Sequence, residues 1–173
     1  MWIYEKKLQY PVKIATPNAR LAGVIITALG GPDGELGASM RYLNQRYTMP
    51  DGRVIGILTD VGSEELGHME MVASIVYQLT RNLTPAEIKA GGFDKYYVDN
   101  GAAIYPSSAS GVPFNAMAIA SKEDSLASIH EDLAADAAII KEQPLRKKSR
   151  KPLKYKDFSH LGKTPENCIP AII

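Results

Sequence analysis

The sequence is poor in several features that mark common protein classes. It contains a single cysteine, Cys168, which excludes an internal disulfide and fits a reducing compartment. No stretch approaches the roughly 20 consecutive apolar residues that a membrane-spanning helix needs. The opening segment "MWIYEKKLQYPVKI" is broken by charges and a proline, so it lacks the apolar run of a secretion signal. We therefore expect a cytoplasmic protein that does not enter a membrane.

Net charge is also nearly absent. The chain has 20 Lys and Arg against 19 Asp and Glu, a formal charge of +1. A balance this even excludes a large field that would attract nucleic acid or an anionic membrane. One region departs from it: "KEQPLRKKSRKPLKYK", residues 141–156, holds eight basic residues against one acidic residue, with two prolines. We predict a helical domain over residues 1–141 and a basic, proline-containing tail over 142–173.

Apolar residues recur at helical spacing in what remains. The first such segment starts near Thr16 or Asn18, either of which can cap a helix, and "GGPDGELG" interrupts it before it resumes at Glu35. Further helices are predicted over 54–81 and 124–141, with one helical turn at 85–89 in a segment rich in Gly, Pro and Ser. At 173 residues the chain suits one domain, and the pattern predicts an all-α fold of the helix-bundle type.

Each predicted main helix carries an ionisable residue on its apolar stripe. Glu35 continues the stripe of the first helix if that helix is continuous across the glycine-proline stretch. Glu65 and His68 lie on the stripe of the second helix, which Val61, Val72, Ile75 and Leu79 extend. Asp136 shares a predicted inward face with Leu126, Ile129, Leu133 and Ile140. A buried carboxylate costs several kcal/mol unless it is paired, protonated or bound to metal.

No Lys or Arg is comparably placed in this pattern, so a pair of divalent metal ions would supply the missing positive charge. Glu65 and His68, three residues apart, lie on adjacent turns of one helix face and can reach the same ion. Oxygen and imidazole ligands suit manganese or iron better than a metal bound by thiolates.

Other polar residues have simpler interpretations. Glu64, Glu70 and Glu131 fall off the stripes and are predicted to be solvated, and His130 and His160 are predicted to be surface residues. The glycine-rich "GGPDGELG" lacks the Lys-Ser/Thr of a phosphate-binding loop, which argues against a nucleotide site.

Three stretches resemble the manganese catalases, most closely their short spore-coat (CotJC-type) branch. They are "MWIYEKKLQYPV", the run from Gly30 to Thr80 that contains "GSEELGHMEM", and "AAIYPSSASGVPF". The resemblance covers about residues 1–136. It implies a ferritin-like four-helix bundle with two manganese ions that dismutes hydrogen peroxide to water and dioxygen, with iron as the less favoured metal. The matching motifs imply Glu35, Glu65, His68 and Asp136 as metal ligands, the first three also as catalytic residues, and Tyr42 as a tyrosine beside them.

The chain departs from the family pattern at its C-terminal side. Asp136 stands where the family has a longer Glu, and the similarity ends there. The following "AAIIKEQPLRKKSRKPLKYKDFSHLGKTPENCIPAII" contains no fourth amphipathic helix, so we expect that helix to be missing or replaced by the basic tail, as in a truncated copy or a lost reading frame. His160 is the only histidine there and does not match the family's fourth-helix ligand.

A bundle without its fourth helix exposes an apolar face, which predicts a homo-oligomer. The resemblance adds assembly into the spore coat, where the basic run could contact an acidic coat partner. Two alternatives stay open: a structural spore-coat protein with impaired catalysis, and a generic di-metal carboxylate bundle.

Overall fold

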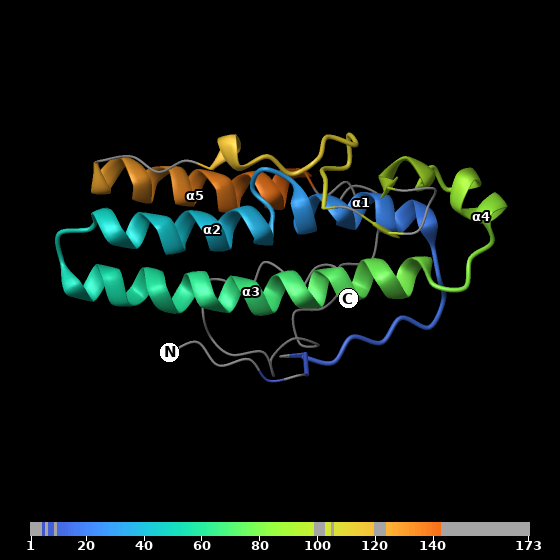
Figure 1. Ribbon diagram of the computed structural model, residues 1–173, viewed down its shortest axis with the longest axis horizontal. Helices are drawn as coiled ribbons and strands as arrows, with labels where there is room; N and C mark the ends of the chain where they lie inside the picture. Colours follow the sequence, from blue (N-terminus) through green and yellow to red (C-terminus); the bar gives the residue numbers. More distant parts are fainter. Residues whose placement is uncertain are drawn as a thin grey trace.

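The computed structural model consists mainly of helices packed side by side (Figure 1). It describes residues 5, 7, 8, 10–98, 103, 104, 106–119 and 124–142, and of residues 98, 103 and 136–142 the backbone alone. The α-helices are α1 (Ala19–Gly30), α2 (Glu35–Gln45), α3 (Gly52–Thr80), α4 (Pro85–Ala90) and α5 (Ser125–Glu142). Turns of 3-10 helix, η1 (Arg46–Thr48), η2 (Asp94–Tyr96) and η3 (Ala116–Ala118), lie in the connections. Within these described residues, no helix is both long and apolar enough to cross a membrane.

Polar side chains fix where four of these helices begin. Each accepts a hydrogen bond from a backbone N–H of the first turn, which has no partner within the helix. The capping residues are Asn18 for α1, Asp51 for α3, Thr84 for α4 and Asp124 for α5. Asn18 rather than Thr16 is therefore the first cap, and the helices predicted over 54–81 and 124–141 are confirmed to within about two residues at each end.

α1 and α2 follow one another almost in line, separated by the turn Gly31–Gly34 (Figure 1). The Gly31 N–H donates to the Thr27 carbonyl at 2.8 Å and so ends α1. A Cβ atom on Gly34 would lie 2.7 Å from the same carbonyl oxygen, so the chain can pass this closely only with glycine. The predicted interruption at "GGPDGELG" is confirmed, and it makes Glu35 the first residue of α2.

The main apolar core lies between α1 and the C-terminal half of α3. The predicted α3 stripe is confirmed there, because Val72, Ile75 and Leu79 are almost fully buried. They pack with Ile25 and Ile26 of α1 and with Phe93, which follows α4. A smaller cluster of Ala38, Tyr42, Met49 and Leu58 joins α2 to the N-terminal half of α3. These two clusters hold the three helix segments that carry the site.

The segments outside the bundle pack against it. Gln78 of α3 accepts from the Ile14 N–H and donates to the Val12 carbonyl, both at 2.9 Å, so the described part of the N-terminal arm is docked on α3. The segment after α4 contains a two-stranded antiparallel pair, β1 (Tyr97–Val98) with β2 (Ala103–Ile104), which the sequence pattern did not predict. Beyond it, the Ala109 N–H donates to the Thr27 hydroxyl at 2.6 Å and fastens this segment to α1.

α5 lies along α2 with a different face inward from the one predicted (Figure 1). The side chains of Leu126, Ile129 and Leu133 are exposed, and Ser128, Asp132 and Ala135 are buried instead. The physical reason is a polar contact: the buried Gln45 amide of α2 donates to the Asp132 carboxylate at 2.9 Å. A buried amide requires such a partner, so the polar face turns inward. The prediction of an apolar inward stripe at these leucines is therefore wrong.

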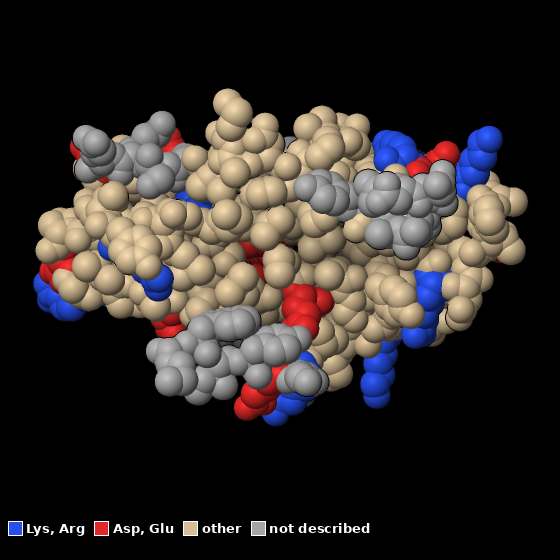
Figure 2. All heavy atoms as spheres, viewed as in Figure 1, with Lys and Arg blue, Asp and Glu red and all other residues tan. Residues whose placement is uncertain are grey.

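Charged side chains of both signs are scattered over the face in Figure 2, with no large area of one sign. This agrees with the even charge balance of the sequence. The predicted basic tail, and with it the expectation about a fourth helix, lies outside the described residues apart from Glu142 at the end of α5.

Candidate metal centre

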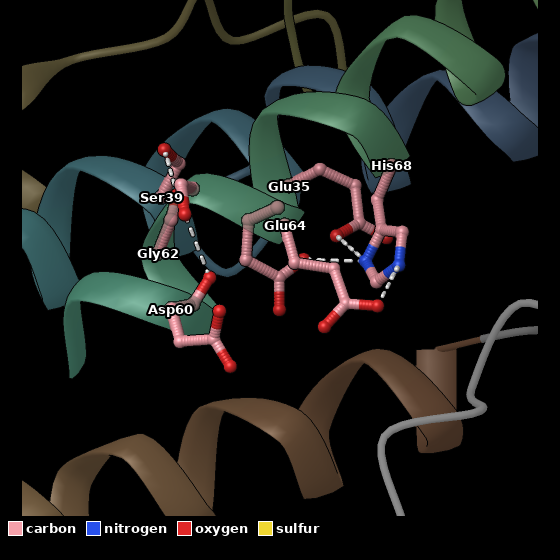
Figure 3. Close-up of polar contacts among 8 residues, drawn as sticks. Glu35, Ser39, Asp60, Gly62, Glu64 and His68 are labelled. Carbon is pink, nitrogen blue, oxygen red and sulfur yellow. Dashed lines mark hydrogen bonds and ion pairs between the residues drawn. The ribbon is translucent and has the colours of Figure 1, made fainter. Parts of the chain in front are cut away.

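A close approach of α2 and α3 places the candidate ligands opposite one another. The Ser39 hydroxyl of α2 donates to the Gly62 carbonyl of α3 at 2.8 Å, and both residues are buried (Figure 3). A Cβ atom on Gly62 would lie 2.9 Å from Leu43 Cγ, so the two helices can be this close only because residue 62 has no side chain. Ser39 is one turn after Glu35, and Gly62 is three residues before Glu65. The contact therefore fixes the separation of the two glutamates.

Glu35, Glu65 and His68 converge at this point. One donor atom from each lies within 4.8 Å of those of the other two. The Nδ1 atom of His68 is 2.8 Å from Glu65 Oε2 and 3.8 Å from Glu35 Oε2. All three side chains are only 12% exposed. Figure 3 shows Glu35 and Glu64 directed toward opposite nitrogens of the His68 ring.

The imidazole and its neighbours determine the charge state of Glu65. Burial raises the pKa of Glu65, but hydrogen bonds with His68 and Glu35 and the charge of His68 together hold the pKa below its ordinary value. Glu65 is therefore held ionised despite little contact with water. An ionised carboxylate and an imidazole nitrogen directed at one point are the forms that bind a divalent cation.

The donor set fits such an ion. Oxygen ligands of hard divalent cations lie about 2.0–2.6 Å from the metal, so two ligands of one ion can be about 4–5 Å apart. The three donor atoms satisfy this limit without rearrangement of the helices. Two carboxylates and one imidazole suit manganese or iron, and the absence of thiolate ligands from the group argues against a zinc site of the structural kind.

Four other residues considered from the sequence have different outcomes. Tyr42 is buried between α2 and α3, two turns after Glu35 on the same helix face, and a role beside the metal stays a prediction. Asp136 lies in α5, but its side chain is outside the described part of the structure, so its role as a ligand also stays a prediction. His130 is exposed, as predicted, and His160 lies outside the described residues.

Two charged residues of α2 and α3 make contacts that the sequence pattern did not predict. Glu64 is exposed, as predicted, with 41% of its side chain accessible, but its Oε1 atom also lies 3.9 Å from His68 Nε2. Its spacing of four residues from His68 could have indicated this contact. Arg41 is 3% exposed and pairs with Asp33 at 3.1 Å in the turn before α2. The expectation that no Lys or Arg is placed inward as the carboxylates are is therefore wrong, because Arg41 of α2 is buried, with its ion pair to Asp33.

Comparisons with known proteins agree with this geometry. The family model for manganese-containing catalases matches residues 1–143. The protein CotJC of Bacillus subtilis is 52% identical over 136 residues, an alignment that covers 79% of this chain and 71% of that protein. A probable manganese catalase of Clostridium acetobutylicum is 30% identical over 138 residues, covering 79% of this chain and 61% of that one.

Solved structures support the fold independently. KatB, a manganese catalase from Anabaena, superposes with a TM-score of 0.72 over 96% of this chain and 69% of the KatB chain, at 21% identity. This similarity confirms the predicted ferritin-like helical bundle. The family model matches residues 1–143, and CotJC is 52% identical over 71% of its own length. The chain therefore belongs to the manganese-containing catalase family.

Proposed function

We propose that this protein binds manganese through Glu35, Glu65 and His68, with Asp136 as a further ligand, and dismutes hydrogen peroxide to water and dioxygen. The observation that carries the proposal is the convergence of the three donor atoms within 4.8 Å at a site with little exposure. The same residues stand in the motifs by which the sequence resembles the family. Family membership supports peroxide as the substrate.

The bound manganese would supply the redox chemistry, reducing one peroxide and oxidising a second so that two peroxides yield two waters and one dioxygen. The residues of the chain supply the setting. Glu35 and Glu65 would provide negative charge that favours a divalent ion, and His68 would provide a neutral nitrogen ligand. On binding metal, Nδ1 would exchange its 2.8 Å contact with Glu65 for the ion, and the Glu64 carboxylate, 3.9 Å from Nε2, would lie on the side of the ring that keeps its proton.

We further propose that the protein forms homo-oligomers and assembles into the spore coat. What supports it is the 52% identity to CotJC and the exposed apolar residues Leu126, Ile129 and Leu133 on α5. The alternative, a coat protein without turnover, is favoured by one feature: Asp136 is shorter than the family's Glu. Metal content and oxygen release distinguish the two.

The test uses the full chain, stripped of metal and reconstituted with manganese or with iron. We expect bound manganese by elemental analysis and oxygen release from peroxide at an oxygen electrode. His68→Ala should lose both, whereas His130→Ala, which removes an exposed histidine, should lose neither.

The outcomes separate the hypotheses. Wild-type protein that binds no manganese overturns the proposed site. Manganese binding without oxygen release overturns the catalase activity and favours the structural alternative. Oxygen release with iron alone would replace manganese as the proposed metal.

A further inference from the structure

The interface between α2 and α5 is unusual because polar residues are buried there while the large apolar residues Leu126, Ile129 and Leu133 of α5 are exposed. Gln45 is fully buried and Asp132 is 8% exposed, and the two join residues 87 positions apart in the sequence. Ser128, one turn before Asp132, is also fully buried. Within the single chain, apolar burial would favour turning Leu126 and Leu133 toward α2, so a polar interaction that opposes this turn can account for the observed rotation of α5.

The Gln45–Asp132 hydrogen bond can supply that interaction. Each of these groups would lose its hydrogen bonds to water on burial, and a buried polar group left without a partner costs about 1–3 kcal/mol, more when it is charged. Rotating α5 to bury its leucines would expose Asp132 but leave the Gln45 amide buried without this acceptor. A hydrogen bond to a charged group is also more directional than apolar contact, so it specifies one rotation rather than many.

The direction of α5 connects this contact to the metal centre. α5 runs antiparallel to α2, so beyond Asp132 it continues toward the Glu35 end of α2 (Figure 1). Asp136 follows Asp132 by four residues, which is about 6 Å along a helix and little more than one turn. The rotation that places Asp132 against Gln45 therefore also determines the helix face on which Asp136 lies.

We propose that Gln45 and Asp132 are positioning residues: their buried hydrogen bond fixes the rotation of α5 on α2, and through it the placement of Asp136 at the manganese site. The second part rests on the proposed function, and the first does not. Neither residue is a member of the group of converging donors, Glu35, Glu65 and His68.

Cysteine labelling measures the rotation without metal or activity. In a Cys168→Ser background, single cysteines are placed at Leu133, which is 63% exposed, and at Ala135, which is 7% exposed. With Gln45 present, we expect the cysteine at 133 to react with a thiol reagent at least tenfold faster than the one at 135. Gln45→Leu, which keeps the volume but removes the amide, should reduce this ratio strongly. Asp132→Asn, which keeps a hydrogen-bond acceptor, should preserve it, and so should Leu126→Gln on the exposed face.

Manganese titration of the same variants, with Cys168 intact, tests the second part. We expect Gln45→Leu to weaken manganese affinity at least tenfold and Asp132→Asn to stay close to wild type. An unchanged labelling ratio in folded Gln45→Leu, or in Gln45→Ala should the former not fold, overturns the proposed role of the pair. A changed ratio with unchanged manganese affinity overturns the link to Asp136. If wild-type protein binds no manganese, the proposed function fails, while the labelling ratio still decides the rotation.

Discussion

Two glycines of α3 allow the cost of the close contact between α2 and α3 to be predicted. A Cβ atom on Gly56 would meet nothing within 4 Å, whereas one on Gly62 would lie 2.9 Å from Leu43 Cγ and 3.1 Å from Tyr42 Cβ. Both positions are in the interior of the same helix, so replacement by alanine gives each the same gain in helix propensity, about 0.5–1 kcal/mol. The two substitutions therefore differ mainly in packing.

The expected packing cost follows from these distances. The Leu43 side chain can move aside in part, but Tyr42 Cβ is attached directly to the α2 backbone and cannot. Relief then requires the helices to separate, and overpacking of this kind costs about 1–3 kcal/mol. We expect Gly56→Ala to stabilise the protein by about 0.5–1 kcal/mol and Gly62→Ala to destabilise it by up to about 2 kcal/mol. For a chain of this size the two melting temperatures should differ by roughly 2–4 °C per kcal/mol.

The assay is thermal and urea unfolding of both variants beside wild type, followed by manganese titration. Separation of α2 from α3 moves Glu35 away from Glu65, so Gly62→Ala should also weaken manganese binding, and Gly56→Ala should not. Equal stability of the two variants would refute the reasoning, because it would mean that the contact at Gly62 yields without cost.

Three further predictions concern charge and helix ends. Asp33→Asn should lower the free energy of unfolding by about 3 kcal/mol, because it leaves the Arg41 guanidinium, which is 3% exposed, without its counter-charge. Arg41→Met should cost less, because the Asp33 carboxylate that it leaves is 33% exposed and can be solvated. Urea unfolding that gives the opposite order would contradict this. The Glu65 carboxylate lies beside the ionisable groups of Glu35 and His68, and His68 in turn lies beside Glu64. In metal-free protein, ionised Glu65 contributes to the free energy of unfolding. This contribution is fully present above the ordinary pKa of 4.5 and is lost as the pH falls through the lowered pKa of the folded state. Unfolding measured with a chelator from pH 6 to about 3 should therefore show a shallower acid loss in Glu65→Gln, and an identical slope would exclude this contribution. Asn18→Ala should cost about 1 kcal/mol through the lost cap of α1, measurable as a lower urea midpoint with unchanged manganese affinity.

Much of the site could be predicted because its residues are close in sequence or lie on a strongly periodic helix. Glu65 and His68 are three residues apart, so helical geometry alone brings them together. The buried face of α3 followed from Val72, Ile75 and Leu79, whose burial the structure confirms. The sequence places Glu35 on an inward face only if the first helix is continuous. The turn Gly31–Gly34 interrupts that helix, but α2 follows α1 almost in line, and the Glu35 side chain is only 12% exposed.

The rotation of α5 shows where such reasoning stops. Apolar spacing predicted that Leu126, Ile129 and Leu133 face inward, and the structure exposes them. That choice depends on Gln45, a residue 87 positions away from Asp132 whose need for a hydrogen-bond partner is invisible in the α5 sequence itself. The buried Arg41 was missed for a similar reason, since its partner Asp33 lies in a turn rather than on a helix face.

The sequence by itself determined the main helices, the region of the first helix cap and the pairing of Glu65 with His68, because these depend on backbone hydrogen bonds and on side chains within one or two turns. Only the tertiary structure decided how far apart α2 and α3 lie, which face of α5 is buried, and that Glu35 reaches the same point as the other two ligands. Those outcomes depend on contacts between helices, in which one absent side chain at Gly62 and one buried amide at Gln45 outweigh the local pattern.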